Sequence, residues 1–353
     1  MGLILALDQG ATKTAALVAT AGGEILGVGY SRGACHASDG MDAAMAAVRE
    51  AAAAALGQAG LGAEAGAVAH GPMPGAGPAP DVPAPGLPAH IDHVYAGMTG
   101  ADWPHEYPLL ETALREATGV ANVTVVNDCI IARRAGTDAP WGAVLCAGTG
   151  LNAAVISPRG DSYIYGYYIN GDDNGGTALG RLSLRAVFGA EAGIAPPTLL
   201  TAGLLNHFRL TTVDDLMMRY VGGELGPTST LVPILVEAVR AGDAVAERIV
   251  GEFGERLARY VTAGLRRFAM TDLEQDVVLS GGIFKADLPG LRERVTQAIR
   301  RDVPGARAVD ARYEPVVGAL LLALEQRGEK GVSLETPAIA ASAAQFKLIR
   351  MCS

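Results

Sequence analysis

The stretch LILALDQGATKT, residues 3–14, constrains the fold of this chain more than any other. Its apolar beginning, residues 3–7, predicts a short buried strand. Asp8 lies where that strand ends, Gly10 allows a tight turn, and two hydroxyls and an ammonium group follow on Thr12, Lys13 and Thr14. Backbone N–H groups and short hydroxyls in such a turn form a cradle for phosphate oxygens, and an acid beside the cradle typically serves magnesium. An ordinary β-turn explains the same residue types, so this stretch alone leaves both interpretations open.

Composition and charge exclude several classes of protein. The 353 residues suffice for two domains, and half of them are hydrophobic, so the chain can bury a large core. The net charge of −9 argues against a nucleic-acid partner, because phosphate backbones attract basic surfaces. There is no apolar run long enough to span a bilayer, and there is no signal-peptide pattern. The cysteines form no C-x-x-C pair, which favours free thiols in a reducing compartment. We therefore expect a cytoplasmic protein without a membrane partner.

Alternating apolar runs and turn signals predict an α/β protein. Strands are expected at residues 3–7, 15–19, 25–30, 93–98, 123–126, 142–146, 153–156 and 276–280. Helices are expected from an N-cap at Asp42, over 107–118, from 181, through most of 197–268, over 291–299 and over 315–324. An ordered loop is expected over 163–180, and a proline-rich surface loop over 71–88. The strand–helix–strand order over 93–126 implies a parallel part of a sheet, where ligands gather at the carboxyl ends of strands.

A second strand–turn–strand unit repeats the first. The segment CAGTG places Gly148, Thr149 and Gly150 after an apolar strand, and another strand returns from the turn. Two such units, one in each half of the chain, predict two related domains. A short polar link at residues 137–140 is the expected boundary between them.

Several motifs in the same order resemble the N-acetylglucosamine kinase family (the BadF/BadG/BcrA/BcrD-type group) of the actin-like ATPase superfamily, over nearly the whole chain. They are LDQGATKT, VVNDCIIARRAG, CAGTG, INGDDNGGTALGRLSLRAV, IAPPTLLTAGLLNHF, VVLSGGIF and EPVVGALLLAL. The resemblance implies an α/β fold of two actin-like (ribonuclease H-like) domains with a nucleotide cleft between them. The domains would be residues 1–137 with 313–328, and residues 138–312, followed by a loosely attached tail over 329–353.

The chemistry that the resemblance implies is transfer of the γ-phosphoryl group of ATP to a sugar hydroxyl, with ATP and Mg²⁺ as cofactors. Asp8 would hold the metal, through water. The implied nucleotide-binding residues are Asp8, Gly10, Thr12, Lys13, Thr14, Gly148, Thr149, Gly150, Gly281 and Gly282. The last two would let the backbone approach the adenosine.

Asp128 matches the catalytic base of the family. Phosphoryl transfer needs mainly positioning and charge neutralisation, with one group to accept the hydroxyl proton, and a carboxylate at a strand end is rigid enough to be aimed. The alternative for Asn127 and Asp128 is a helix N-cap. The implied acceptor-binding residues are Asn127, Asp128, Thr149, Gly171 and Asp172. For Asp173 a solvated turn is an equal alternative.

The sequence departs from the family in the sugar pocket. The family usually has an asparagine shortly after the third strand, whereas this chain reads SRGACHASDG, where His36 or Ser38 could substitute. Asp173 and Asn174 stand where the family usually has glutamate and glycine. The expected acceptor is therefore an amino sugar, N-acetylglucosamine or glucosamine at its 6-hydroxyl, or a related sugar-like cyclitol. The expected assembly is a homodimer.

Two other functions fit parts of the sequence. The first is an activator ATPase of the 2-hydroxyacyl-CoA dehydratase type, which bridges an iron–sulfur cluster across a dimer; Cys146 beside the second turn favours it. Those activators carry a long helix after that turn, whereas residues 152–156 are typical of a strand. The second is a sugar-sensing regulator with a degenerate active site, against which the presence of both Asp8 and Asp128 argues.

Overall fold

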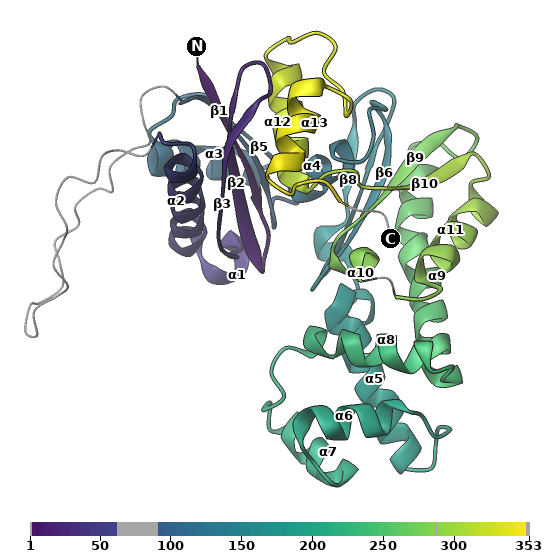
Figure 1. Ribbon diagram of the computed structural model, residues 1–353. Helices are drawn as coiled ribbons and strands as arrows, with labels where there is room; N and C mark the ends of the chain where they lie inside the picture. Colours follow the sequence, from purple (N-terminus) through teal and green to yellow (C-terminus); the bar gives the residue numbers. More distant parts are fainter. Residues whose placement is uncertain (1, 62–90, 287, 351–353) are drawn as a thin grey trace, which may run out of the picture. The chain divides into compact units, whose positions relative to one another are not determined.

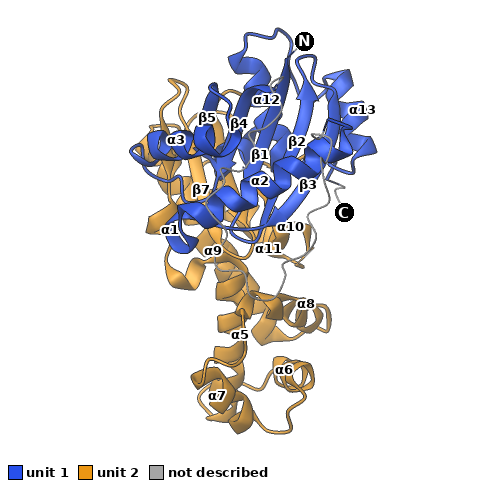
Figure 2. Cartoon of the chain, turned by 90° about the vertical axis from the view of Figure 1, so that its left-hand side faces the viewer, with its two compact units in different colours: residues 1–135, 313–350 blue, residues 136–312, 351–353 orange. Residues whose placement is uncertain are grey.

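The computed structural model describes residues 2–61, 91–286 and 288–350, which divide into two compact units (Figures 1 and 2). Unit 1 comprises the described residues up to 135 together with 313–350, and unit 2 comprises those of 136–312. The proline-rich loop expected at 71–88 lies outside the described residues. In the described part of the chain, the helices are too short or too polar to cross a membrane.

Unit 1 is built on a mixed five-stranded sheet with the strand order β3-β2-β1-β4-β5. The strands are β1 (Leu3–Gln9), β2 (Lys13–Thr20), β3 (Ile25–Arg32), β4 (Ile91–Met98) and β5 (Val123–Asn127). The first three are antiparallel, while β4 and β5 continue the sheet parallel to β1. The predicted hairpins and the predicted parallel portion are both confirmed.

Helices cover both faces of this sheet (Figure 1). They are α1 (His36–Asp39), α2 (Met41–Gln58), α3 (Glu106–Thr118), α4 (Asp128–Arg134), α12 (Pro315–Gln326) and α13 (Pro337–Gln345). Alternate side chains of β1 face opposite sides of the sheet. Leu5 and Leu7 pack with α2 and α3, whereas Ile4 and Ala6 pack with α12 and α13. Both faces of β1 are therefore buried, which explains its continuous apolar run.

Two expectations for unit 1 are wrong. Helix α2 begins at Met41 after Gly40, whose φ of 88° disfavours other residues, so Asp42 lies in the first turn and is not the N-cap. Residues 329–350 are not loosely attached. Ile339 of α13 is fully buried, and the Ser342 hydroxyl accepts the N–H of Ile25 in β3 at 3.0 Å. The apolar face of α13 completes the core on that side of the sheet.

Unit 2 repeats the same sheet, with the strand order β10-β9-β6-β7-β8. Its strands are β6 (Gly142–Ala147), β7 (Leu151–Ile156), β8 (Ser162–Ile164), β9 (Gln275–Ser280) and β10 (Ala306–Asp310). Strands β6 to β8 are antiparallel, and β9 and β10 run parallel to β6. Each strand of unit 2 thus has a counterpart in unit 1. The sequence did not predict β10, because this short edge strand is only partly buried and carries charged residues.

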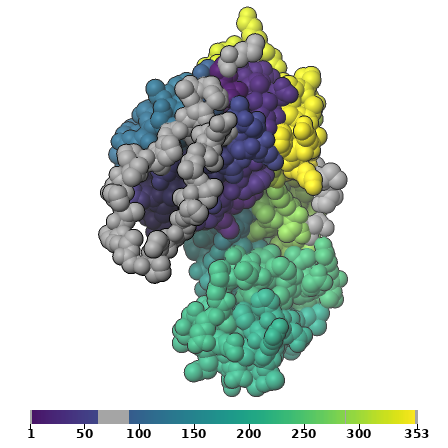
Figure 3. All heavy atoms as spheres, turned by 60° about the vertical axis from the view of Figure 1, so that its left-hand side comes forward, coloured from purple at the N-terminus to yellow at the C-terminus, as the bar shows by residue number. Residues whose placement is uncertain are grey.

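Unit 2 also contains a large helical part. Its helices are η1 (Gly166–Tyr168), η2 (Gly171–Asp173), α5 (Gly175–Glu191), α6 (Leu200–Phe208), α7 (Val213–Val221), η3 (Thr228–Leu231), α8 (Val232–Arg240), α9 (Ala244–Arg267), α10 (Gly282–Lys285) and α11 (Leu291–Asp302). Helices α6 and α7 lie at the end of α5 away from the sheet of unit 2 (Figures 1 and 2). The teal part of the chain, which contains these helices, forms a rounded lobe in the space-filling view (Figure 3). Helix α5 begins inside the segment 163–180 that was expected to be a loop.

Candidate active site

The first predicted phosphate turn lies between β1 and β2 of unit 1. The N–H of Gly10 donates to the carbonyl of Lys13 at 3.0 Å and closes the turn, and Thr12 and Lys13 are exposed. The Lys13 ammonium lies 5.1 Å from the centre of the Tyr30 ring, close enough for a cation–π contact. Gly33, which sequence reasoning missed, packs against the turn: a Cβ there would lie 2.3 Å from the Thr12 nitrogen. The turn is thus held in place while its polar side chains stay accessible.

Thr14 differs from its two predecessors. It is fully buried in β2, and its hydroxyl has no hydrogen-bond partner within the described residues. Gln9, its partner across the β1–β2 pair, is also fully buried and donates its amide to the Ala44 carbonyl at 2.7 Å. A buried hydroxyl cannot contact a phosphate in this conformation. Of the three polar side chains predicted to bind phosphate at this turn, those of Thr12 and Lys13 are accessible and that of Thr14 is not.

The two predicted carboxylates of unit 1 lie on the same edge of its sheet. Asp8 at the end of β1 pairs with Gly97 of β4, and Met98 of β4 pairs with Asn127 at the end of β5. Asp128 follows as the first residue of α4 and is half-buried. Because all three strands are parallel, their carboxyl ends meet at one edge, which is where open α/β sheets bind ligands.

Asn127 holds the start of α4. Its side-chain oxygen accepts the N–H of Cys129 at 2.9 Å, so the N-cap interpretation is confirmed for this residue. Its amide group donates to the Ala101 carbonyl at 3.1 Å and to an Asp102 carboxylate oxygen at 2.7 Å. Asn127 is fully buried and both amide hydrogens are used, so it positions Asp128 rather than offering donors to an acceptor.

A further acid, Glu106, joins this network at the start of α3. One of its oxygens accepts the N–H groups of Asp102 and Trp103 at 2.8 and 2.7 Å, and the other lies 3.7 Å from Nε2 of His36. The His36 ring packs against Gly100, where a Cβ would lie 3.1 Å from the ring. His36 therefore lies near the carboxyl ends of the unit 1 strands, the same edge that carries Asp128. The hydroxyl of Ser38, the other proposed substitute for the family's asparagine, donates only to its neighbour Asp39.

The second predicted phosphate turn connects β6 to β7 in unit 2 and is bound to α5. The N–H of Gly148 donates to the Gly150 carbonyl at 2.8 Å. The first N–H groups of α5, on Gly176 and Thr177, donate to the carbonyls of Gly148 and Thr149 at 2.8 and 3.0 Å. These N–H groups have no partner within their own helix, so the turn caps α5. This contact explains why a glycine-rich segment forms a helix here.

The two glycines expected near the adenosine lie beside this turn. Gly281 ends β9 with a φ of 102°, and a Cβ on it would lie 2.2 Å from the Ala147 carbonyl oxygen. Gly282, by contrast, has open space where its Cβ would be. Unit 2 thus brings Gly148–Gly150 and Gly281–Gly282 together, with one glycine required by the fold and the next facing free space.

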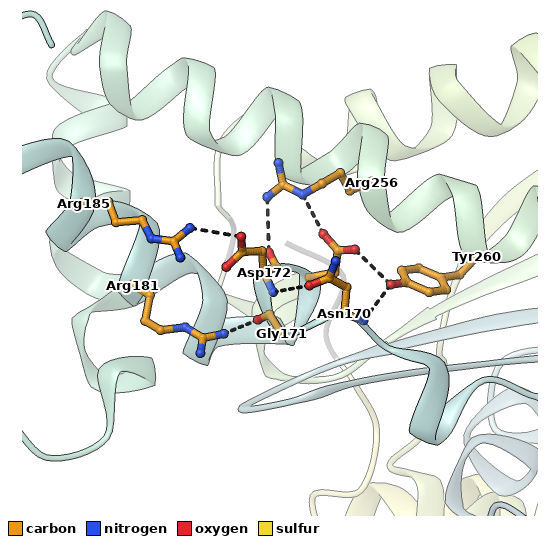
Figure 4. Close-up of polar contacts among 8 residues, drawn as sticks. Asn170, Gly171, Asp172, Arg181, Arg185, Arg256 and Tyr260 are labelled. Carbon is orange, nitrogen blue, oxygen red and sulfur yellow. Dashed lines mark hydrogen bonds and ion pairs between the residues drawn. The ribbon is translucent and has the colours of Figure 1, made fainter. Parts of the chain in front are cut away.

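The predicted sugar loop follows η1 in unit 2 and uses its two aspartates differently (Figure 4). Asp172 is exposed and pairs with Arg185 of α5 at 3.0 Å, and this hydrogen bond lowers the pKa of Asp172, which keeps its carboxylate ionised. Asp173 is buried and accepts from Arg256 at 2.6 Å and from the Tyr260 hydroxyl at 2.9 Å, both on α9. Asp173 is therefore a structural anchor and not a solvated turn residue.

The sugar loop is joined to the second phosphate turn. The side-chain oxygen of Asn174 accepts the N–H of Leu151 at 2.9 Å, directly after the turn. Gly171 accepts a hydrogen bond from Arg181 of α5. The candidate residues of unit 2, Thr149, Gly171 and Asp172, thus belong to one hydrogen-bonded assembly around α5. Sequence reasoning missed Arg181 and Arg185, although their spacing of four residues on a helix was visible in the sequence.

The described residues offer few ligands for a metal ion. Within residues 2–61, 91–286 and 288–350, no group of three or more His, Cys, Asp or Glu side chains is close enough to hold an ion. Mg²⁺ usually keeps several waters and binds one or two carboxylates together with substrate phosphates. A single carboxylate such as Asp8, at the end of β1 beside an exposed turn, fits that kind of binding.

Comparison with known proteins decides the family. The model of the BadF/BadG/BcrA/BcrD ATPase family matches residues 5–323. This chain belongs to that family. Two curated relatives of this family member are an N-acetyl-D-glucosamine kinase of Dictyostelium discoideum, 26% identical over 67% of this chain and 76% of the relative, and an N-acetylmuramic acid/N-acetylglucosamine kinase of Clostridium acetobutylicum, 23% identical over 64% and 75%. The resemblance inferred from the motifs is confirmed.

Solved structures confirm the fold of this member of the BadF/BadG/BcrA/BcrD ATPase family. A candidate N-acetylglucosamine kinase of Chromobacterium violaceum aligns with a TM-score of 0.67 at 21% identity, covering 91% of this chain and 99% of the other. A ROK family glucokinase of Streptomyces griseus, solved with glucose and AMPPNP, aligns with a TM-score of 0.54 at 22% identity over 91% and 99%. The predicted α/β fold of two actin-like domains is therefore correct.

Proposed function

We propose that this ATPase-family member is an ATP-dependent sugar kinase, which transfers the γ-phosphoryl group to a hydroxyl of an amino sugar or a related cyclitol. The 6-hydroxyl of N-acetylglucosamine or glucosamine is the proposed acceptor group. The observation that carries the proposal is the position of Asp128, held at the carboxyl edge of the unit 1 sheet that also carries Asp8. The kinase names of the curated relatives support it.

Asp128 is proposed as the general base. Its carboxylate would accept the proton of the acceptor hydroxyl as the oxygen attacks phosphorus, which is the one proton transfer that phosphoryl transfer requires. Asn127 donates a hydrogen bond to Asp102 and accepts one from the N–H of Cys129 at the start of α4, and these bonds hold the backbone of Asp128 in place. Such support matters because a catalytic group must be kept within a few tenths of an ångström of its productive geometry.

The nucleotide is proposed to bind the two Gly/Thr turns. Thr12 and Lys13 would bind phosphate oxygens by a hydroxyl and an ammonium group. Thr149 and Gly150 would do so through backbone N–H groups, because the N–H of Gly148 is used within the turn. The open space at Gly282 would let adenosine approach the backbone. When bound near Asp8, Mg²⁺ would supply charge neutralisation of the phosphates. We further propose a cytoplasmic homodimer.

The activator ATPase is less well supported. Strand β7 begins at Leu151, directly after the second turn, where the activators are expected to carry a long helix. The test is iron analysis after anaerobic purification, and a protein without iron would exclude this alternative.

The sugar kinase is tested by ADP release over a panel of amino sugars and cyclitols, using wild type and Asp128→Asn. The substitution removes the basic carboxylate with little change in shape, so turnover should fall by roughly 10²–10⁴-fold. Binding of ATP, measured by calorimetry, should be retained. Asp42→Asn, at an exposed position in α2, is the matched control and should keep full activity. Undiminished turnover by Asp128→Asn would refute the assignment of the base.

A further inference from the structure

A pocket lies at the edge of the unit 2 sheet opposite the candidate site. Strands β10, β9 and β6 are parallel neighbours (Figure 1), and the glycine turns of the candidate site follow the carboxyl ends of β6 and β9. The pocket has a volume of about 500 Å³, and residues at the amino ends of the same strands line it, among them Trp141, Gln275 and Ala306. Small-molecule sites usually measure roughly 300–1,000 Å³. The length of β9, roughly 17 Å, separates the pocket from Gly281, so the pocket is not part of the candidate active site.

Two of the four charged residues that line the pocket neutralise each other. Nε of Arg307 donates to one carboxylate oxygen of Asp276 at 2.8 Å, and the other oxygen accepts the hydroxyl of Thr137 at 2.5 Å. Asp276 is buried and lies opposite Arg307 in the β9–β10 pair, so this ion pair joins the two strands. It leaves no net charge for a ligand.

Glu274 and Arg300, the other two charged residues, have no such partner. Glu274 directly precedes β9 and is exposed, and it makes no hydrogen bond or ion pair with any residue that the structure describes. Arg300, in the last turn of α11, donates from Nε to the Ala306 carbonyl at 3.4 Å, and both of its terminal nitrogens lack a partner in the same part of the chain. The pocket therefore presents one unpaired cation and one unpaired carboxylate.

Trp141 and Gln275 add an apolar wall and a hydrogen-bond acceptor. Trp141 is partly buried against the core of unit 2, and it lines the pocket together with Pro140 and Pro304. The side-chain nitrogen of Gln275 donates to the Met270 carbonyl at 2.9 Å, whereas its Oε1 is buried without a hydrogen-bond partner among the described residues. A buried acceptor without a partner is unfavourable, and an N–H group of a ligand would satisfy it.

We propose that this pocket binds a free amino acid with an aromatic side chain. The carboxylate of the ligand would bind the two terminal nitrogens of Arg300, because their planar arrangement matches two carboxylate oxygens. The ammonium group would bind Glu274, and the ring would stack on Trp141. This site takes no part in phosphoryl transfer, and its ligand is neither the nucleotide nor the acceptor of the proposed kinase.

Charge balance selects a zwitterion over other small ligands. One positive and one negative group on the ligand neutralise Glu274 and Arg300 together. A simple carboxylic acid would leave Glu274 unpaired, and a simple amine would leave Arg300 unpaired. A phosphate monoester would bring close to two negative charges beside Glu274, where like charges repel.

The test is calorimetric titration of the full chain with four compounds. These are L-phenylalanine, 2-phenylethylamine, which lacks the carboxylate, 3-phenylpropionate, which lacks the ammonium group, and L-alanine, which lacks the ring. L-Phenylalanine should bind about tenfold more tightly than the amine or the acid, the effect of one hydrogen bond to a charged group. It should exceed L-alanine by about the same factor, because burial of the ring is favourable.

Two variants separate the two charges of the ligand. Arg300→Gln should weaken binding of L-phenylalanine and 3-phenylpropionate by about tenfold and leave 2-phenylethylamine unchanged, because only the first two carry a carboxylate. Glu274→Gln should weaken L-phenylalanine and 2-phenylethylamine and leave 3-phenylpropionate unweakened. Arg294→Gln, at an exposed position of α11 outside the pocket, is the matched control and should keep all wild-type affinities. Urea denaturation checks that each variant is folded.

Each outcome decides one part of the proposal. Equal affinity for L-phenylalanine and either singly charged analogue would refute a zwitterionic ligand, and equal affinity for L-alanine would refute an aromatic one. Absence of binding by all four compounds, or an Arg300→Gln variant that binds them like Arg294→Gln, would overturn the site. The titrations contain neither ATP nor sugar, so a failure here leaves the kinase proposal standing, and a failure of the kinase leaves this site standing.

Discussion

The turn after β1 in unit 1 and the turn after β6 in unit 2 have the same pattern of strand, Gly/Thr turn and returning strand, but they are stabilised differently. The first is closed by the Gly10 hydrogen bond and packs against Gly33. The second also receives two N–H groups and a hydroxyl from the first turn of α5, and packs against Gly281. The first turn is a hairpin that packs against neighbouring residues of its own sheet, whereas the second is part of a helix–turn assembly.

This difference predicts where substitutions will be costly. A change beside the second turn must disturb β6, β9 and α5 together, because their backbones meet there. A change beside the first turn can be absorbed by movement of the exposed residues at its tip. Two experiments on residues beside these turns test this comparison, and two experiments on other parts of the units follow, in decreasing order of expected effect.

Gly281→Ala should have the largest effect. The residue has a φ of 102°, which disfavours side chains, and the new Cβ would meet the Ala147 carbonyl at 2.2 Å. Strain of this kind and overpacking together cost roughly 2–5 kcal/mol of unfolding free energy. The loss is measured by urea denaturation, with Gly282→Ala as the control because its Cβ would meet open space. Equal stability of the two variants would show that the second turn is not braced by Gly281.

Gly33→Ala tests the first turn in the same way. Its Cβ would approach the Thr12 nitrogen to 2.3 Å without a positive φ, so overpacking alone applies, at about 1–3 kcal/mol. Because the turn tip can move, we expect a smaller stability loss than for Gly281→Ala and a higher KM for ATP. The comparison fails if Gly33→Ala destabilises the protein more than Gly281→Ala does.

Asp173→Asn and Asp172→Asn separate the two neighbouring aspartates of the sugar loop. The first leaves Arg256 without its carboxylate and should cost about 1–2 kcal/mol, less than for a fully buried pair because Arg256 is partly exposed. Asp172→Asn breaks only an exposed pair and should change stability by less than about 1 kcal/mol. Urea denaturation measures both. A reversed order would mean that Asp172, and not Asp173, anchors the loop.

His93→Gln, in unit 1, should change how the stability of the protein depends on pH. Burial lowers the pKa of His93, with Arg327 acting in the same direction, so the folded protein binds a proton at this ring less readily than the unfolded chain does. The unfolded chain binds that proton as the pH falls through about 6.5, so the stability of the protein should decrease there. The variant should lose this dependence, while the exposed His105→Gln should retain it. Identical pH profiles for wild type and His93→Gln would contradict the assignment.

The sequence determined much of the framework. The apolar runs at residues 3–7 and 142–146 predicted the central strands of both sheets, because strands buried on both faces need apolar side chains at every position. Turn glycines predicted the two strand–turn–strand units. The alternation of strand and helix predicted the parallel strands whose carboxyl ends carry Asp8 and Asp128. These features depend on local chemistry and on spacing along the chain, so a single sequence carries them.

Only the tertiary structure decided what each polar residue does. Nothing local separates Asp172 from Asp173. Their roles differ because Arg256 and Tyr260, more than eighty residues further along the chain, hydrogen-bond to the carboxylate of Asp173 and not to that of Asp172. The sequence pattern predicts that Thr14 is an accessible turn residue, but it is buried inside the sheet. Helix α5 starts at glycines because the carbonyls of a distant turn accept its first N–H groups. Such partners are brought together by folding, so no pattern of neighbouring residues could have identified them.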